Sequence, residues 1–531
     1  MSRPDRDVIV IGAGMGGIYA VHRLTRQGLS VLGIESAPEV GGVWYHNAYP
    51  GARVDLESHY YCYLFDDDLY REWRWSERYA AQPELLRYLK HVADRFDVRR
   101  HFRFRTSVVG ARWNEDARRW VVETDAGDVV TGRFLVCTTG QLSKAREPRF
   151  PGLGTFRGRW VLTSHWPQDG VDLRGKKVGV IGTGSSGVQA STAIAAEAER
   201  LVVFQRTPNY SVPAHNRPAD PVLHAELSRD LAAVRRKVAA APAGNLTPGY
   251  VGRAADFSPK RRRELLDERW AFGGQPMLTL FSDQGTDLEA NRIVGDYVRD
   301  KVREVVKDPV VAERLVPNAY PIGTRRLCVD TGYYEIFNQD NVTLADIRSD
   351  PIRRITPGGI ETRDTSYDLD VIVFAIGFEA FTGALDGADI RNAAGELVSD
   401  RWRRGPQTYL GLMTAGFPNL FLITGPGSPS VLANMNVHNV QHLDFVGDLI
   451  DHARERGADR IEPTRQAQDE WTAHAAEVAR PLIRRQVDNY MVHVNKDDGS
   501  RIFIPYGGGF HQYVRRCHAV AEAGFRGFDL R

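Results

Sequence analysis

Asp7-Val-Ile-Val-Ile-Gly12-Ala-Gly14-Met-Gly-Gly17 opens the chain, and Lys177-Val-Gly-Val-Ile-Gly182-Thr-Gly184-Ser-Ser-Gly187 repeats its pattern in mid-chain. Each stretch is a short apolar strand that runs into a Gly-x-Gly-x-x-Gly turn and then a helix. The glycines permit a tight turn, and the start of the helix presents free N–H groups to a pyrophosphate. Two such fingerprints in one chain predict two nucleotide cofactors and electron transfer between them.

The strand that follows each fingerprint distinguishes the two cofactors. Glu35 ends the strand after the first fingerprint, and a carboxylate there accepts hydrogen bonds from a ribose 2′-OH. Gln205 stands at the matching place after the second fingerprint, and Arg206 follows it. Loss of the acid and gain of a guanidinium suit a 2′-phosphate. We therefore expect the first site to bind FAD and the second to bind NADPH, although Arg206 could also simply face solvent.

Composition limits the class of protein. A chain of 531 residues needs two or three domains. The net charge of +2 gives no reason to expect nucleic acid or an anionic membrane as a partner. The four cysteines are far apart in sequence, so we expect a reducing compartment, namely the cytoplasm, with no metal centre and no redox dithiol. Charged residues interrupt every apolar run, so no membrane span is expected. We expect a monomer or a weak homodimer.

The pattern along the chain predicts an α/β fold with two Rossmann-like dinucleotide-binding domains and a helical insertion. The strands Asp370-Val-Ile-Val-Phe-Ala-Ile-Gly377 and Asn419-Leu-Phe-Leu-Ile-Thr-Gly425 suit parallel sheets. The expected division is an FAD domain from 1–141 and 376–531, an NADPH domain from 142–212 and 322–375, and a helical insertion over 213–321. The last part of the FAD domain includes a C-terminal lid loop.

Further motifs resemble the Baeyer–Villiger monooxygenases, class B flavoprotein monooxygenases, and within them the phenylacetone and cyclohexanone monooxygenase branch. The resemblance covers nearly the whole chain. It is carried by Gly41-Gly-Val-Trp44-Tyr, Tyr49-Pro-Gly-Ala-Arg53-Val-Asp55, Ser76-Glu-Arg-Tyr-Ala-Ala-Gln-Pro83, Phe156-x-Gly158-x-x-x-Leu162-x-x-x-Trp166-Pro167, Phe204-Gln-Arg206-Thr-Pro208, Tyr320-Pro-Ile-Gly-Thr-Arg325-Arg326, Gly425-Pro-Gly-Ser-Pro429 and Tyr506-Gly-Gly-Gly-Phe510.

The resemblance implies a reaction. NADPH reduces FAD, the flavin captures O2 as a C4a-peroxide, and the peroxide attacks a ketone that rearranges to an ester or lactone. It also implies a set of cofactor-binding residues, which is Gly12, Gly14, Gly17, Glu35, Gly42, Trp44 and Asp55 for FAD and Gly182, Gly184, Gly187, Arg206, Thr207 and Arg325 for NADPH.

Two residues match the family's catalytic pair. Arg326 corresponds to the arginine that stabilises negative charge near the flavin, and Asp55 corresponds to the acid that orients it through a bidentate contact. The structural alternatives are that Arg326 is a solvated charge in a loop and that Asp55 caps a turn.

The sequence departs from the family pattern in two places. Leu162 stands where the family fingerprint has histidine, and His165 either substitutes for it or is merely packed. The tail loop 489–501 lacks the family's tryptophan, which predicts a wider site for bulky or fused-ring ketones. A related flavin monooxygenase that oxidises nitrogen or sulfur remains the alternative function. A disulfide reductase would need a pair of cysteines near the flavin, and Cys62 has no nearby cysteine in the sequence, which argues against that function.

Overall fold

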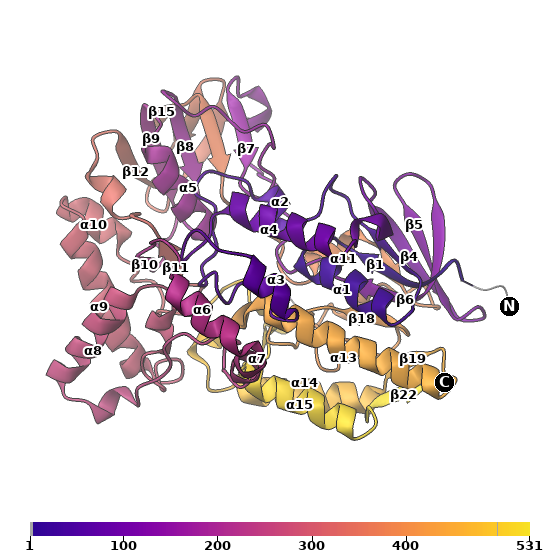
Figure 1. Ribbon diagram of the computed structural model, residues 1–531. Coiled ribbons are helices and arrows are strands. Elements are labelled where there is room, and N and C mark those ends of the chain that lie inside the picture. The colour runs from indigo at the N-terminus through magenta and orange to yellow at the C-terminus, as the bar shows by residue number, and fades with distance from the viewer. Residues whose placement is uncertain (1–3, 496) are drawn as a thin grey trace.

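A computed structural model describes residues 4–495 and 497–531. Two separate sheets of largely parallel strands organise the molecule, and each carries one fingerprint (Figure 1). This arrangement confirms the predicted α/β fold with two dinucleotide-binding sheets.

The first sheet has eight strands. Its central strand β1 lies parallel to β2 on one side and to β6 on the other, and β18 also pairs with β6. The strand order is β17 (Ile390–Arg391), β4 (Val108–Asn114), β5 (Arg119–Thr124), β6 (Val129–Cys137), β1 (Arg6–Ile11), β2 (Val31–Ile34) and β3 (Phe102–Arg103), with β18 (Leu420–Leu422) off this path.

The sequence of β1 explains its central place. Val8, Ile9 and Val10 are fully buried, because both faces of a parallel sheet are covered. The chain then turns through the fingerprint into helix α1 (Met15–Arg26) at the carboxyl edge of the sheet. Ligands of open α/β sheets bind at this edge.

The second sheet is entirely parallel and has five strands. Its order is β12 (Val342–Asp346), β9 (Arg200–Gln205), β8 (Lys177–Ile181), β16 (Val371–Phe374) and β7 (Arg159–Leu162). Helix α5 (Ser185–Ala195) follows the second fingerprint. A three-stranded unit covers this sheet with the apolar residues Ile355 and Ile360, which share a core cluster with Phe204 and Phe374. It consists of β13 (Ile352–Thr356), β14 (Gly359–Thr362) and β15 (Ser366–Asp368).

Helices fill the chain between the two parts of the second sheet and after the last strand of the first. In Figure 1 the helices α8, α9 and α10 lie on the side of the second sheet, and α13, α14 and α15 lie beneath the first sheet. The helices of these two stretches are α6 (Pro221–Arg229), α7 (Leu231–Ala239), α8 (Pro259–Phe272), α9 (Leu288–Val305), α10 (Pro309–Leu315), α13 (Met435–Glu455), α14 (Arg465–Ala479) and α15 (Phe510–Glu522).

Further elements complete the fold. The remaining helices are α2 (Val43–His46), α3 (Asp67–Glu72), α4 (Gln82–Arg95), α11 (Gly383–Gly387) and α12 (Val398–Arg401). Three pairs of strands stand outside the larger sheets, namely β10 (Ser211–Pro213) with β11 (Cys328–Asp330), β19 (Ile461–Pro463) with β22 (Phe528–Leu530), and β20 (Val492–Val494) with β21 (Arg501–Phe503). Within the described ranges, no helix is both long and apolar enough to cross a bilayer.

Candidate functional site

The first fingerprint packs tightly against its own turn. A Cβ atom on Gly17 would lie 1.8 Å from the carbonyl oxygen of Gly12, so only glycine allows the helix to start this close to the strand. Gly42 has a φ of 55°, and a Cβ atom on it would lie 2.9 Å from Cα of Gly14. The Gly41-Gly42 turn and the fingerprint therefore form one surface of bare backbone, which suits a close-lying ligand.

Glu35 is placed as the ribose hypothesis requires, at the end of β2 and beside the fingerprint. Its Oε2 accepts a hydrogen bond of 2.6 Å from the N–H of Ala13, and its Oε1 accepts one of 2.7 Å from the N–H of Ala37. A carboxylate has about four lone-pair sites, so acceptor capacity remains for a ribose hydroxyl.

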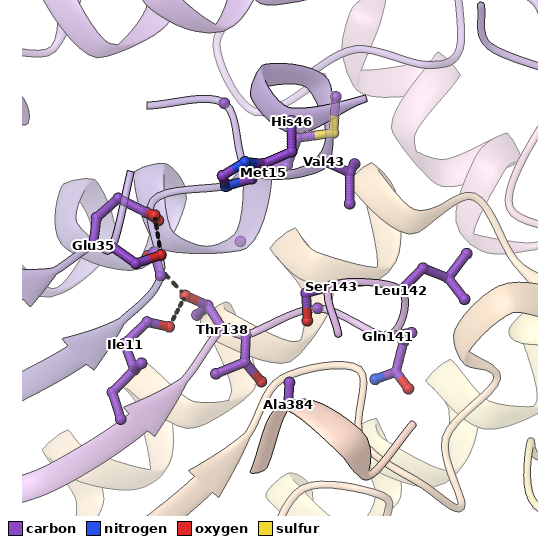
Figure 2. A pocket seen from close by; sticks show the side chains of 18 of the residues that line it. Ile11, Met15, Glu35, Val43, His46, Thr138, Gln141, Leu142, Ser143 and Ala384 are labelled. Carbon is purple, nitrogen blue, oxygen red and sulfur yellow. Dashed lines mark hydrogen bonds between the residues drawn. The ribbon is translucent and has the colours of Figure 1, made fainter. Parts of the chain in front are cut away.

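A cavity of about 470 Å³ opens at this edge of the first sheet. Glu35 and Ile11 lie on one side of it, and Gln141 and Leu142 lie on the opposite side (Figure 2). Other predicted FAD residues also line it, namely Gly12, Gly14, Gly42 and Trp44. The residues present therefore fit a dinucleotide, because glycine backbone, a ribose acceptor and a mostly apolar enclosure occur in one cavity.

The second fingerprint repeats the tight packing. A Cβ atom on Gly187 would lie 2.0 Å from the carbonyl oxygen of Gly182, whereas nothing lies within 4 Å of a Cβ atom on Gly184. The middle glycine thus faces open space at the start of α5, where a phosphate can approach.

Gln205 and Arg206 diverge at the end of β9. Gln205 is buried, and its Nε2 donates a hydrogen bond of 2.7 Å to the carbonyl of Arg314. Arg206 is exposed and has no ion-pair partner among the described residues. The carbonyl of Thr207 accepts a hydrogen bond of 2.9 Å from Thr183, which ties this turn to the fingerprint. The guanidinium of Arg325 lies 4.4 Å from the ring centroid of Tyr320.

Asp55 and Arg326 form the bidentate pair that the resemblance implies. Nε of Arg326 donates to Oδ2 of Asp55 at 2.6 Å, and Nη2 donates to Oδ1 at 2.7 Å. Nη1 donates to the carbonyl of Val431 at 3.0 Å, and Val431 lines the cavity. Since a guanidinium has five N–H donors, two remain without a partner among the described residues. Asp55 also accepts a long hydrogen bond of 3.4 Å from Gln275.

Electrostatics keep Arg326 charged. Burial acts to lower the pKa of Arg326, but the charge of Asp55 and its hydrogen bonds outweigh burial and raise that pKa above its usual range. The Arg326 side chain nevertheless keeps 38% of its surface accessible. It is a cation held in one orientation with a partly accessible side chain, which suits a role in charge stabilisation.

His165 lies beside His46 in the wall of the cavity. Their ring centroids are 5.0 Å apart, and both residues line the cavity. The N–H of Trp166 donates to the carbonyl of His46 at 3.0 Å, so the segment after β7 is joined to α2. Burial, with a smaller contribution from His165, lowers the pKa of His46 to about 4. Leu162 ends β7 and faces the apolar cluster around Phe374 instead.

In the tail loop, the side chain of Asn489 binds backbone and that of Tyr490 stacks on another ring. Asn489 does not cover the site with its side chain, because its Nδ2 donates to the carbonyls of Arg484 and Val487 at 2.9 and 2.8 Å. Tyr490 stacks on Phe381 at 6.3 Å between ring centroids. Lys496 of this loop lies outside the described residues.

Sequence reasoning missed several residues of the cavity. Tyr61, Gln141, Val431 and His46 all line it, yet none belongs to a spacing pattern that indicates a ligand. Tyr61 accepts a hydrogen bond of 3.3 Å from the indole of Trp44. Gln141 and Val431 follow buried strands, whereas His46 and Tyr61 lie in the aromatic-rich stretch 44–75 after the first fingerprint.

Comparisons with known proteins agree with this geometry. The family of flavin-binding monooxygenase-like proteins matches residues 5–229. A Baeyer–Villiger monooxygenase of Pseudooceanicola batsensis is 40% identical, with 98% of this chain and 95% of that protein covered. A solved structure of oxidized steroid monooxygenase bound to NADP is 46% identical, with 99% of each chain covered and a TM-score of 0.95. A solved structure of OTEMO with FAD and NADP is 39% identical over 100% of each chain, with a TM-score of 0.96.

Identity at this level over full length establishes the family and its cofactors. FAD and NADPH are thus confirmed, and so is the predicted reaction class. The chain belongs to the Baeyer–Villiger monooxygenases, flavoproteins that use FAD and NADPH to convert ketones into esters or lactones.

Proposed function

We propose that Arg326 is the catalytic cation of this enzyme and that Asp55 positions it. The observation that carries the proposal is the bidentate contact of 2.6 and 2.7 Å, which fixes the guanidinium plane. Bound FAD, once reduced by NADPH, supplies the oxygen that is inserted from O2. Arg326 then stabilises the negative charge that develops on the oxygen of the ketone carbonyl.

The two cofactors are proposed to lie on the two sheets. Gly12, Gly14, Gly17, Glu35, Gly42, Trp44 and Asp55 hold FAD, while Gly182, Gly184, Gly187, Arg206, Thr207 and Arg325 hold NADPH. The exposed guanidinium of Arg206 supports binding of a 2′-phosphate, because its donors have no partner within the described chain.

The domain limits are proposed as the sequence sets them. An FAD domain from 1–141 and 376–531 is supported by β17 and β18, which return to the first sheet. An NADPH domain from 142–212 and 322–375 is supported by β12 and β16, which return to the second. The segment 213–321 between them is the proposed insertion, and limited proteolysis at its ends tests this division.

The proposed substrates are bulky or fused-ring ketones. Asn489 is turned to its own backbone, so the tail loop places no large side chain at this position. A steroid monooxygenase at 46% identity supports the same substrate class. We also propose a cytoplasmic monomer or weak homodimer, with no nucleic-acid or membrane partner. Four buried free thiols support the reducing compartment, and sedimentation tests the assembly.

The test is NADPH-dependent O2 consumption with a panel of ketones, followed by mass analysis of the products. Ester or lactone heavier than the ketone by one oxygen atom is expected. Sulfoxide or N-oxide from added sulfides or amines, with no ester from any ketone, would favour the alternative oxidation of sulfur or nitrogen.

A further inference from the structure

Arg484 is a cation without a partner near the proposed catalytic pair. It lies in the short turn Ile483–Gln486, directly before the tail loop. Asn489 fixes its backbone by donating to its carbonyl at 2.9 Å. Within residues 4–495 and 497–531, the guanidinium itself makes no hydrogen bond, ion pair or cation–π contact.

Three other arginines of the interior have strong partners within the chain. Arg78 pairs with Glu57 and donates to the carbonyl of Phe272 at 2.7 Å. Arg269 donates to two backbone carbonyls at 2.7 and 2.9 Å. Arg326 has both oxygens of Asp55. Arg484 has no such partner among the described residues, and it is only partly buried.

The segment that carries Arg484 packs beside the catalytic pair. Leu482, two residues before Arg484, lies in one apolar cluster with Tyr490 and Val431, and the carbonyl of Val431 accepts a hydrogen bond of 3.0 Å from Arg326. Burial and the nearby charge of Arg326 lower the pKa of Arg484, while Tyr490 opposes them. Arg484 thus lies on the segment that packs against the residue held by Arg326.

Charge balance calls for an anion here. Asp55 neutralises Arg326, and both of its oxygens are already in use. Arg484 therefore adds a positive charge that nothing in the described chain compensates. A partly buried cation is stabilised by a partner of opposite charge, and a carboxylate binds a guanidinium with two parallel hydrogen bonds.

We propose that Arg484 is an anion-binding residue of the substrate site and recognises the carboxylate of a ketone substrate that carries an acidic side chain. This inference rests on the proposed function and narrows its substrate class to keto acids. NADPH is the other possible source of an anion. Its 2′-phosphate already has Arg206 and Arg325, and its pyrophosphate has the start of α5, so the substrate is the better match for Arg484.

The experiment uses the FAD-loaded enzyme and a matched pair of ligands, a decalone with an acetate side chain and the methyl ester of the same compound. Binding is followed by the change in flavin absorbance, and turnover is followed by kcat/KM for formation of the lactone. The wild type is expected to bind the acid more tightly than the ester. Arg484→Met is expected to reduce the preference for the acid over the ester roughly tenfold or more, both in binding affinity and in kcat/KM, because a charge-assisted contact is lost. Arg484→Lys is expected to restore part of the ratio.

The neighbour Arg485 provides the matched control, because Arg485→Met removes an equal charge one residue away and should leave the ratio unchanged. Equal losses for acid and ester in Arg484→Met would overturn the proposal, as would a raised KM for NADPH with an unchanged ratio. Equal binding of acid and ester by the wild type would overturn it as well. If the wild type binds the acid selectively but oxidises neither ketone, the proposed function fails while this inference stands.

Discussion

The carboxylate of Asp55 holds the guanidinium of Arg326 edge-on, through contacts of 2.7 Å to Nη2 and 2.6 Å to Nε. These residues are 271 positions apart in sequence. Asp55 follows the Gly42 turn of the first nucleotide unit, and Arg326 precedes β11. The contact therefore joins the segment after the first fingerprint to the segment after helices α6 to α10, and it orients the two N–H groups of Arg326 that have no partner among the described residues.

Replacing Arg326 with Ala should abolish ester formation while flavin remains bound. The cation acts on charge that develops at the carbonyl, and loss of one such donor costs roughly 10²–10³-fold in kcat. NADPH oxidation should persist, with oxygen appearing as H2O2. Product yield per NADPH measures this, and Arg326→Lys, which keeps the charge but not the fork, is the control. Normal ester yield from the Ala variant would rule out the role.

Replacing Asp55 with Asn should be milder than removing Arg326. An amide keeps one acceptor and the size of the side chain, so the guanidinium stays nearby but loses its fixed plane and its counter-charge. Misplacement of this kind costs roughly 100-fold or less. The expected signature is a lower kcat with a nearly unchanged KM for ketone. A defect as large as that of Arg326→Ala would show that Asp55 does more than orient.

The fold and the cofactors could be predicted from the sequence because both depend on local signals. Gly12, Gly17 and Glu35 are fixed by their distance from one strand, and the structure places them accordingly. The cavity wall could not be predicted in the same way. His46 meets His165, and Val431 meets Arg326, only because segments from separate sheets and helices come together. Neither contact has a periodicity or spacing in the sequence.

Arg206→Ala should weaken NADPH more than NADH. Arg206 is exposed at the end of β9, where a 2′-phosphate is expected, and Gln205 cannot replace it because its amide is committed to Arg314. Loss of one charge-assisted contact lowers affinity roughly tenfold. The ratio of kcat/KM for NADPH over NADH is the measurement. A wild-type enzyme that uses NADH equally well would contradict the prediction before any variant is made.

Acid should loosen the contact between His46 and His165. The pKa of His46 is lowered in the folded state to about 4, from an ordinary value of 6.5. The unfolded chain thus binds more protons between these values, and the folded state loses stability as the pH falls from about 6.5 towards 4. Flavin release should follow the same range, because His46 lines the cavity.

Flavin fluorescence against pH measures this loss, and His46→Phe, which keeps a ring but cannot titrate, should shift it to lower pH. His22→Phe is the control, because burial also lowers the pKa of His22 to about 4 but that residue packs on Phe65 and Phe96. It should change the free energy of unfolding without a specific change in flavin release. Identical profiles for wild type and His46→Phe would exclude the histidine pair as the cause.

The tail loop should determine how large a ketone the enzyme accepts and how much oxygen it wastes. Asn489 holds the loop through the carbonyls of Arg484 and Val487, and it accepts a hydrogen bond of 2.8 Å from the N–H of Met491. With no large side chain at this position, the wild type should oxidise fused-ring ketones at least as well as small cyclic ones. It should also release measurable H2O2, since water is less well excluded.

Two substitutions distinguish the effect of side-chain size at position 489 from the effect of the hydrogen bonds that hold the loop. Asn489→Ala removes the hydrogen bonds without adding bulk, so H2O2 per NADPH should rise while the size preference stays. Asn489→Trp removes the same hydrogen bonds and adds a large ring, so kcat/KM should fall for fused-ring ketones relative to small ones. Kinetics over ketones of rising size, with H2O2 assayed in parallel, decide between them. If the wild type strictly prefers the smallest ketones with tight coupling, and the Trp variant behaves like the Ala variant, then the loop does not control the size of the site.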